Sequence, residues 1–107
     1  MFAADQATDY RKIKFAIAGL AGATFEDKND CAAREPVSIL HIHGTADTDI
    51  LYDGGVHGSS GVVYPGAIES VGRWVAVDGC DATSVPGTPR DIELEIAGDE
   101  TTVDIYP

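Results

Sequence analysis

A short, almost unbroken apolar run over residues 37–42 limits the fold of this chain more than any other stretch. The run is rich in β-branched residues and is bounded by Pro36 and Gly44. Such a run is typical of a strand covered on both faces, usually in the parallel sheet of an α/β fold. Polar residues follow directly, among them Asp47 and Asp49. Because ligands and catalytic groups gather at the carboxyl ends of strands in open α/β sheets, we expect a functional site in this loop.

Two further elements are predicted before this strand. Apolar residues at spacings of three and four predict a helix over residues 2–13, and a short apolar strand follows over 15–20. The polar residues 23–36 are typical of a loop. We therefore expect the strands at 15–20 and 37–43 to lie side by side and parallel.

A glycine-rich connection and a helix are predicted after the strand. Residues 53–62 contain four glycines, which predicts a flexible connection without regular structure. A helix is expected over 65–79, with a proline in its first turn and a glycine at its end. Its apolar face predicts that Trp74 is buried with Ile68 and Val71.

The C-terminal part of the chain changes from helical to strand periodicity. Residues 82–90 are typical of a linker, with two prolines and a glycine. Apolar and polar residues then alternate over 92–97 and 103–105, with Gly98-Asp99-Glu100 between them, which predicts a β-hairpin. The sequence as a whole predicts one α/β domain over residues 1–107, with a parallel sheet, packed helices and a C-terminal β-hairpin.

Charge and hydropathy exclude two classes of partner. The chain has 18 acidic and 7 basic residues, a formal net charge of −11. Nucleic-acid binding needs clustered Lys and Arg, so we expect no nucleic-acid partner. No apolar run approaches the roughly 20 residues that span a membrane, so we expect no membrane partner. Residues 1–12 lack the basic and apolar segments of a secretory signal, and the localisation stays open.

His41 and His43 lie two residues apart on the predicted strand, so their side chains share one face. Such a pair, with Asp47 or His57 as a third ligand, is one way to build a metal site. The alternative is that both histidines are packed and hydrogen-bonded near the strand end. We favour this alternative and expect neither a metal nor a cofactor.

Ser59 and Ser60 are the candidate nucleophiles of the chain. They occur in the sequence Gly58-Ser-Ser-Gly61, which misses the G-x-S-x-G elbow pattern by one position. The elbow also requires a strand before the serine and a helix directly after it, whereas this pair follows a glycine-rich stretch. The pattern alone therefore gives little support to either serine.

The loop after residue 42 carries two motifs, HGTAD at 43–47 and YDGG at 52–55. Further short motifs flank them in one consistent order: FAIAGLAG at 15–22, Tyr64-Pro65, Arg73-Trp74 and Gly79-Cys80. Together they resemble the α/β-hydrolase superfamily, above all its secreted polyhydroxybutyrate depolymerase and feruloyl esterase-like group. The resemblance covers about residues 15–80 and implies part of an α/β-hydrolase-type parallel sheet.

The resemblance implies a carboxylic-ester hydrolase with a Ser-His-Asp triad and no cofactor. Asp47 matches the acid of the triad, with Asp49 as the neighbouring alternative. The family order places the serine elbow before Met1 and the histidine beyond Pro107, which implies weak activity for this chain. The resemblance also suggests secretion, and it implies that the partner of Cys80 lies beyond the chain, although a bond between Cys31 and Cys80 remains open.

Three functions remain open at this point. If the chain itself hydrolyses small or polymeric esters, the residues to test are Ser59 or Ser60, His57 or His43, and Asp47. The alternatives are a non-catalytic binding or structural module, and a small metal-binding domain. We also expect a homo-oligomer that forms through exposed sheet edges, at residues 91–106 or 15–20.

Overall fold

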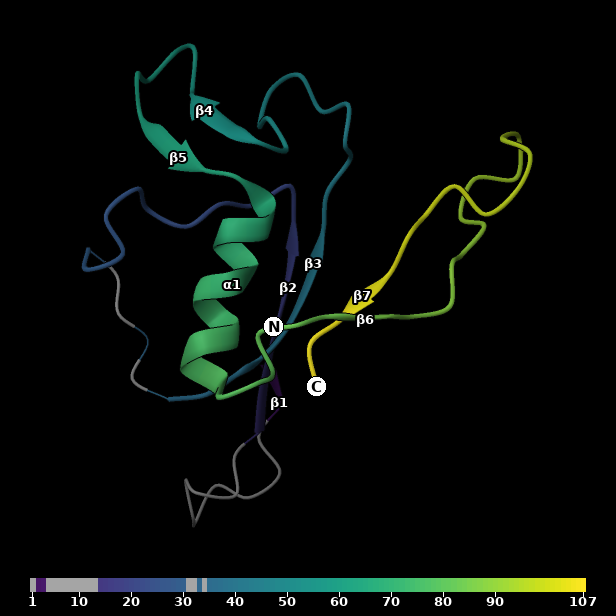
Figure 1. The fold of residues 1–107 in the computed structure, drawn as a ribbon. Coiled ribbons are helices and arrows are strands. Elements are labelled where there is room, and N and C mark those ends of the chain that lie inside the picture. The colour runs from purple at the N-terminus through teal and green to yellow at the C-terminus, as the bar shows by residue number, and fades with distance from the viewer. Residues whose placement is uncertain (1, 4–13, 31–32, 34) are drawn as a thin grey trace.

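Three strands in the order β1-β2-β3 form the central sheet. The computed structural model describes residues 2–3, 14–30, 33 and 35–107. Strand β1 is Phe2–Ala3, β2 is Lys14–Leu20 and β3 is Ser38–Ile42 (Figure 1). β2 and β3 pair in parallel, with Ala16 opposite Ser38 and Leu20 opposite Ile42. This pairing confirms the predicted pair of adjacent parallel strands.

The predicted N-terminal helix is wrong at its first residues. Phe2 and Ala3 form β1, which pairs antiparallel with Phe15 and Lys14 of β2. Pairing with a neighbouring strand, rather than local periodicity, decides the conformation of these two residues. The rest of the predicted helix, residues 4–13, lies outside the described residues.

Helix α1, Ala67–Asp78, packs across β3 and covers one face of the sheet (Figure 1). It ends at Gly79, as predicted, and the φ of 68° at this residue is one that glycine adopts without strain. At the same end, Asp78 Oδ1 accepts a hydrogen bond of 2.8 Å from the backbone N–H of Val37. This bond ties the helix to the start of β3. The buried residues of the helix are Ala67, Ser70 and Val75.

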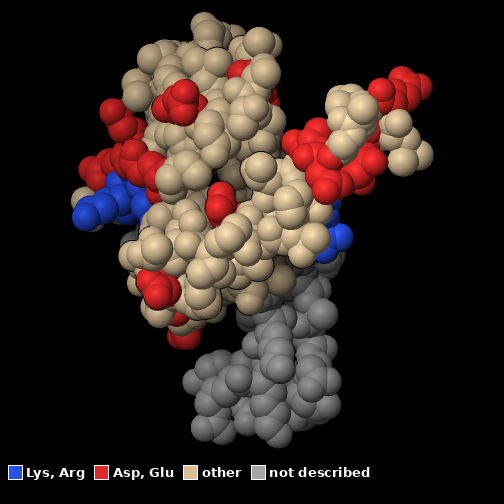
Figure 2. Space-filling model, turned by 45° about the vertical axis from the view of Figure 1, so that its right-hand side comes forward, with Lys and Arg blue, Asp and Glu red and all other residues tan. Residues whose placement is uncertain are grey.

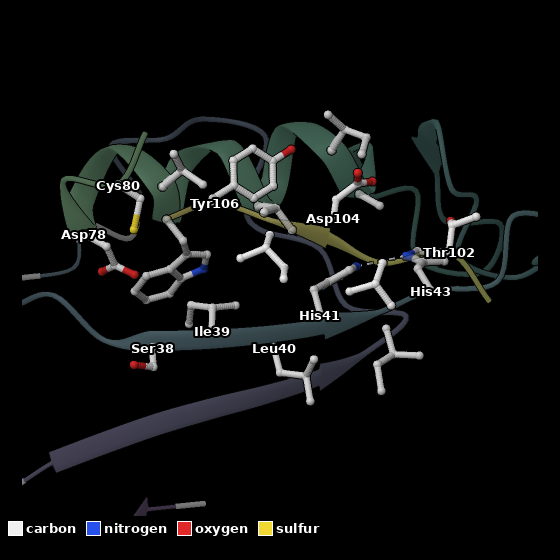
Figure 3. Close-up of a pocket in the computed structure, with 18 of the residues that line it drawn as sticks. Ser38, Ile39, Leu40, His41, His43, Asp78, Cys80, Thr102, Asp104 and Tyr106 are labelled. Carbon is white, nitrogen blue, oxygen red and sulfur yellow. Dashed lines mark hydrogen bonds between the residues drawn. The ribbon is translucent and has the colours of Figure 1, made fainter. Parts of the chain in front are cut away.

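Among the described residues, only one face of β2 and β3 is covered, so the prediction of a strand covered on both faces is wrong for this part of the chain. Ile39 and His41 of β3 point toward α1, and Ser38 and Leu40 point the other way (Figure 3). The outward face of β2 and β3 is exposed and apolar, and Leu20 on it is 76% exposed. The apolar run of β3 thus reflects one packed face and one open face. The residues of the open face are Ala16, Ala18, Leu20, Ser38, Leu40 and Ile42.

The glycine-rich stretch contains regular structure, contrary to the prediction. Strand β4, Gly54–Val56, pairs antiparallel with β5, Val63–Pro65. Gly54 has a φ of 83°, and a Cβ there would lie 2.6 Å from the backbone nitrogen of Gly66. Glycine is required at this position because the two strands approach so closely. The proline predicted in the first turn of the helix instead ends β5.

The C-terminal residues form an extended arm that differs from the predicted hairpin. Strand β6, Val85–Pro86, pairs antiparallel with β7, Asp104–Ile105, and Arg90 forms a single bridge with Thr101. The alternating residues 92–97 form no strand. Figures 1 and 2 show the arm projecting from the rest of the molecule, with acidic side chains near its tip.

The side chain of Glu100 replaces a strand partner at the tip of the arm. Its Oε1 accepts hydrogen bonds from the backbone N–H groups of Ile92 at 2.8 Å and Glu93 at 2.9 Å. A turn follows, and the apolar side chains of the predicted strand face solvent, with Leu94 89% exposed. Alternation alone did not make a strand because, among the described residues, no strand pairs with residues 92–97.

A groove of about 1520 Å³ separates α1 and β3 from the arm. The groove is lined by Ile68, Val71 and Trp74. The predicted burial of these side chains is wrong in part, because Ile68 is exposed, whereas Val71 and Trp74 are half-buried. The parallel strands and the helix define a mixed α/β fold, and an α/β-hydrolase-type sheet remains a prediction. In the described part of the chain, no helix is long and apolar enough to cross a membrane.

Candidate functional site

His41 and His43 are joined in a row of hydrogen bonds at the end of β3 (Figure 3). His43 Nε2 lies 2.6 Å from the carbonyl oxygen of Ile50, so this nitrogen carries the proton and donates it. His43 Nδ1 is then the acceptor for His41 Nε2, at 3.3 Å. The His43 side chain is 2% exposed. Both nitrogens of this ring are therefore occupied and shielded from solvent.

The pKa of His41 is lowered, first by burial and then by the positive charge that a protonated His43 would place beside it. Both effects favour the neutral ring. A hydrogen-bonded pair that contains a neutral His41 corresponds to the packed alternative to a metal site. Among the described residues, no group of three or more His, Cys, Asp or Glu side chains is placed to hold a metal ion.

Asp47 holds the loop after β3 in shape. Its Oδ1 accepts hydrogen bonds of 2.9 Å from the backbone N–H groups of both Asp49 and Ile50. These two bonds are the main reason that the pKa of Asp47 lies below its usual value. Its Oδ2 lies 4.0 Å from His43 Nε2, the nitrogen already bonded to Ile50. Asp47 is therefore an ionised carboxylate with one oxygen committed to its own loop.

His57 lies in the turn between β4 and β5 and contacts both candidate serines. Its Nδ1 lies 3.0 Å from Ser60 Oγ and 3.3 Å from Ser59 Oγ. The turn is fixed by backbone bonds of 2.8 Å, from the N–H of His57 to Val62 O and from the N–H of Gly61 to His57 O. Ser60 Oγ also accepts a bond of 3.3 Å from the N–H of Val62, which leaves its own proton free to point at His57.

Asp49 lies on the other side of the His57 ring. Its Oδ1 is 3.9 Å from His57 Nε2. A carboxylate at this distance favours the tautomer with the proton on Nε2, which makes Nδ1 the acceptor for Ser60. The Asp49 side chain is 87% exposed and that of His57 is 31% exposed, so this row lies at the surface.

The structure brings together three of the residues singled out from the sequence, Ser59, Ser60 and His57. It pairs them with Asp49, the neighbour of the acid that the resemblance favours. Asp47 lies beside His43 instead. No sequence signal ranks Asp49 above Asp47, because the choice depends on where the turn between β4 and β5 places His57.

Cys80 is a half-buried free thiol just after α1. Cys31 lies outside the described residues. Cys80 forms no disulfide with any described residue.

Comparison with known proteins finds no family model that matches this chain, and no curated protein or solved structure that matches it at a significant level.

Proposed function

We propose that this chain hydrolyses carboxylic esters, with Ser60 as the nucleophile, His57 as the base and Asp49 as the carboxylate beside the base. One observation carries the proposal: Ser60 Oγ lies 3.0 Å from one nitrogen of His57, and Asp49 Oδ1 lies 3.9 Å from the other. A nucleophile within hydrogen-bond reach of a base, with the base oriented by a third group, is the arrangement that activates a serine.

The reaction follows from this row of three side chains. Ser60 Oγ attacks the ester carbonyl carbon while its proton moves to His57 Nδ1. As the carbon–oxygen bond to the alcohol breaks, the alcohol takes this proton and leaves Ser60 acylated. Water then attacks the acyl carbon, gives a proton to His57, and the acid departs as Ser60 regains its proton. Asp49 stabilises the positive charge that His57 carries in both halves of the reaction.

We expect slow turnover. The Asp49 side chain is 87% exposed, and water weakens the attraction between an exposed carboxylate and a charged imidazole. The β4–β5 turn is also open to solvent at Ser59 and Ser60. A site open to water forgoes much of the electrostatic stabilisation that enclosed hydrolases supply.

Asp47 is the competing acid, because the resemblance implies this role for it. Its Oδ1 accepts two backbone hydrogen bonds, and its Oδ2 lies 4.0 Å from His43 Nε2. The three histidines of the sequence are engaged elsewhere, since His41 and His43 bond to each other and His57 faces Asp49. An imidazole that Asp47 orients would come from outside this sequence.

A serine-reactive fluorophosphonate tests the proposal. We expect it to label the protein at Ser60, as located by peptide mass mapping, and to stop hydrolysis of p-nitrophenyl acetate. Ser60→Ala should abolish both labelling and turnover. Ser59→Ala is the matched control, because Ser59 is the adjacent serine and lies further from His57, and it should retain both. Turnover that survives Ser60→Ala contradicts the proposal, and no turnover at all favours a non-catalytic module.

We also propose that the chain forms a homo-oligomer. The apolar outward face of β2 and β3 has Leu20 at its end, 76% exposed, and such strands tend to pair or pack with another chain. Leu20→Lys should shift sedimentation at tens of micromolar toward the monomer. Leu94→Lys at the tip of the arm is the matched control. It should leave sedimentation unchanged if the contact forms through the sheet face rather than through the arm. A wild-type monomer at that concentration contradicts the proposal.

A further inference from the structure

A cavity of about 340 Å³ opens beside the proposed nucleophile. Three segments that are far apart in the sequence line it: the loop after β2, the loop after β3, and the β4–β5 hairpin. We infer that this cavity is a subsite for the acyl group of an ester and that it selects short aliphatic acyl chains. The inference rests on the proposed function. The lining residues on which it depends are Ala23, Thr24, Ile50, Ser60, Val62 and Val63.

Ser60 and His57 both line this cavity. An ester attacked by Ser60 Oγ has its carbonyl carbon next to that atom, so one of its two substituents extends into the cavity. The walls formed by Ala23, Ile50 and Val62 are apolar, which suits the hydrocarbon part of an acyl group rather than a charged one. The volume lies near the lower end of the roughly 300–1,000 Å³ range of ligand pockets, which favours short chains.

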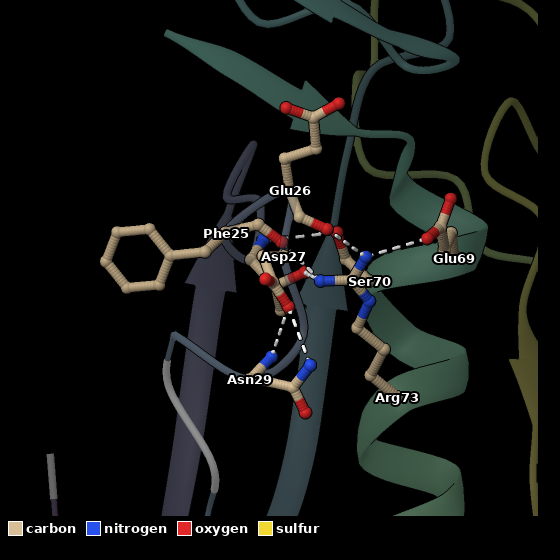
Figure 4. Close-up of polar contacts among 8 residues, drawn as sticks. Phe25, Glu26, Asp27, Asn29, Glu69, Ser70 and Arg73 are labelled. Carbon is tan, nitrogen blue, oxygen red and sulfur yellow. Dashed lines mark hydrogen bonds and ion pairs between the residues drawn. The ribbon is translucent and has the colours of Figure 1, made fainter.

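The wall after β2 is held in place by helix α1 (Figure 4). Arg73 Nη1 donates to Thr24 Oγ1 at 3.1 Å and to the carbonyl oxygen of Phe25, and Nη2 donates to the carbonyl oxygen of Glu26 at 2.9 Å. The backbone N–H of Thr24 also donates to the buried hydroxyl of Ser70 at 3.2 Å.

Four hydrogen bonds thus fix this short loop to a helix, and a cavity with a fixed wall can discriminate between acyl chains of different size. Arg73 acts here as a positioning residue, since it does not line the cavity that Ser60 and His57 line. The larger groove between α1 and the arm is lined by neither Ser60 nor His57.

The test compares kcat/KM for p-nitrophenyl acetate, butyrate and octanoate. We expect butyrate to exceed octanoate by about tenfold, the smaller end of what hydrophobic pockets achieve in size discrimination. Ala23→Leu fills the cavity and should lower the butyrate-to-acetate ratio about fivefold, whereas Val62→Ala enlarges it and should raise the octanoate-to-butyrate ratio. Leu94→Ala on the arm is the matched control and should change neither ratio. Ratios that stay the same in both cavity variants overturn the inference.

A binding measurement separates failure of the subsite from failure of the hydrolase. Methyl butyrate is titrated into the Ser60→Ala protein while the backbone amide signals of Thr24 and Val62 are followed by NMR, with methanol as the control. Shifts at these amides are expected, and they support the subsite even if the wild type shows no turnover. No shift, together with normal turnover by the wild type, overturns the subsite and leaves the proposed hydrolase intact.

Discussion

Two histidine–aspartate pairs lie close together in this molecule and differ in what their hydrogen bonds leave free. His43 is 2% exposed, and both of its nitrogens are occupied, by Ile50 and by His41. One carboxylate oxygen of Asp47, beside it, accepts hydrogen bonds from its own loop. His57 is 31% exposed and has a serine on one nitrogen and Asp49 near the other. The first pair is built into the structure, and the second retains an acceptor that faces a nucleophile.

Residue type alone therefore does not decide which of the two pairs can act in catalysis. A histidine acts as a base only if one nitrogen is free to accept a proton from the nucleophile. In the first pair that nitrogen is used for structure, because a buried polar group without a partner is costly. In the second pair the partner is itself the candidate nucleophile. Each of the following experiments tests this division.

Replacement of the two histidines should give the largest effects, with activity lost in one variant and stability lost in the other. We expect His57→Gln to reduce hydrolysis of p-nitrophenyl acetate to the rate in buffer, because Gln accepts no proton at neutral pH. Its free energy of unfolding in urea should change little, since the ring is partly exposed. His43→Leu should instead lower the free energy of unfolding by about 1–3 kcal/mol, because its buried hydrogen-bond partners lose their contacts.

Turnover per folded molecule then decides which of the two histidine–aspartate pairs acts in catalysis. Folded His43→Leu should keep wild-type turnover per molecule. If this variant loses turnover while it remains folded, and His57→Gln keeps it, the roles of the two pairs are reversed.

Exchange of the two aspartates for asparagine should give an intermediate effect. Asp49→Asn removes the charge beside His57 and should lower kcat/KM up to about fivefold, as expected for an exposed pair. Added salt screens the charge of Asp49 and should therefore lower kcat/KM of the wild type toward the value of Asp49→Asn. Asp47→Asn should have no effect on turnover, because the amide oxygen of Asn accepts the same two backbone N–H groups.

A loss of a hundredfold or more in Asp47→Asn, with Asp49→Asn unchanged, gives a different result. It assigns the triad role to Asp47, as the resemblance implies, since loss of the charge at a triad acid costs far more than at an exposed surface carboxylate. The same two variants thus separate both assignments of the acid.

The smallest effect concerns pH and stability. The lowered pKa of His41 means that the unfolded chain, with the ordinary value of 6.5, binds a proton first as the pH falls. Stability is therefore complete above that value and declines as the pH falls below it. We expect a lower Tm at pH 5.5 than at pH 7.5, and a flatter profile for His41→Gln. Equal slopes in the two proteins contradict the assignment to His41.

A second decline should occur at lower pH in both proteins. Backbone N–H groups lower the pKa of Asp47 and Glu100 below their ordinary values of 3.8 and 4.5. These carboxylates contribute stability that is present above those values and is lost as the pH falls through their lowered pKa. His41→Gln should leave this decline unchanged, which separates the two windows of pH.

Much of the central fold follows from local sequence patterns. The strands at 14–20 and 38–42, their parallel pairing and the helix at 67–78 with its terminal glycine match the prediction closely. The predicted hairpin at 92–105 does not match the structure, although apolar and acidic residues alternate regularly over 92–96. The difference is that β3 has a paired strand and a helix beside it, while residues 92–97 have neither. A strand is stable only with a partner, and periodicity does not supply one.

The residue types of the candidate site follow directly from the sequence: a loop after a strand with two aspartates, and a glycine-rich turn with a histidine and two serines. Which aspartate faces which histidine depends instead on how the chain folds in three dimensions. Asp47 turns back onto its own loop and lies beside His43, whereas the paired strands β4 and β5 carry His57 to Asp49. A contact between side chains on separate loops depends on the path of the backbone between them. That path is set by strand pairing and packing, which the order of residues within either loop does not specify.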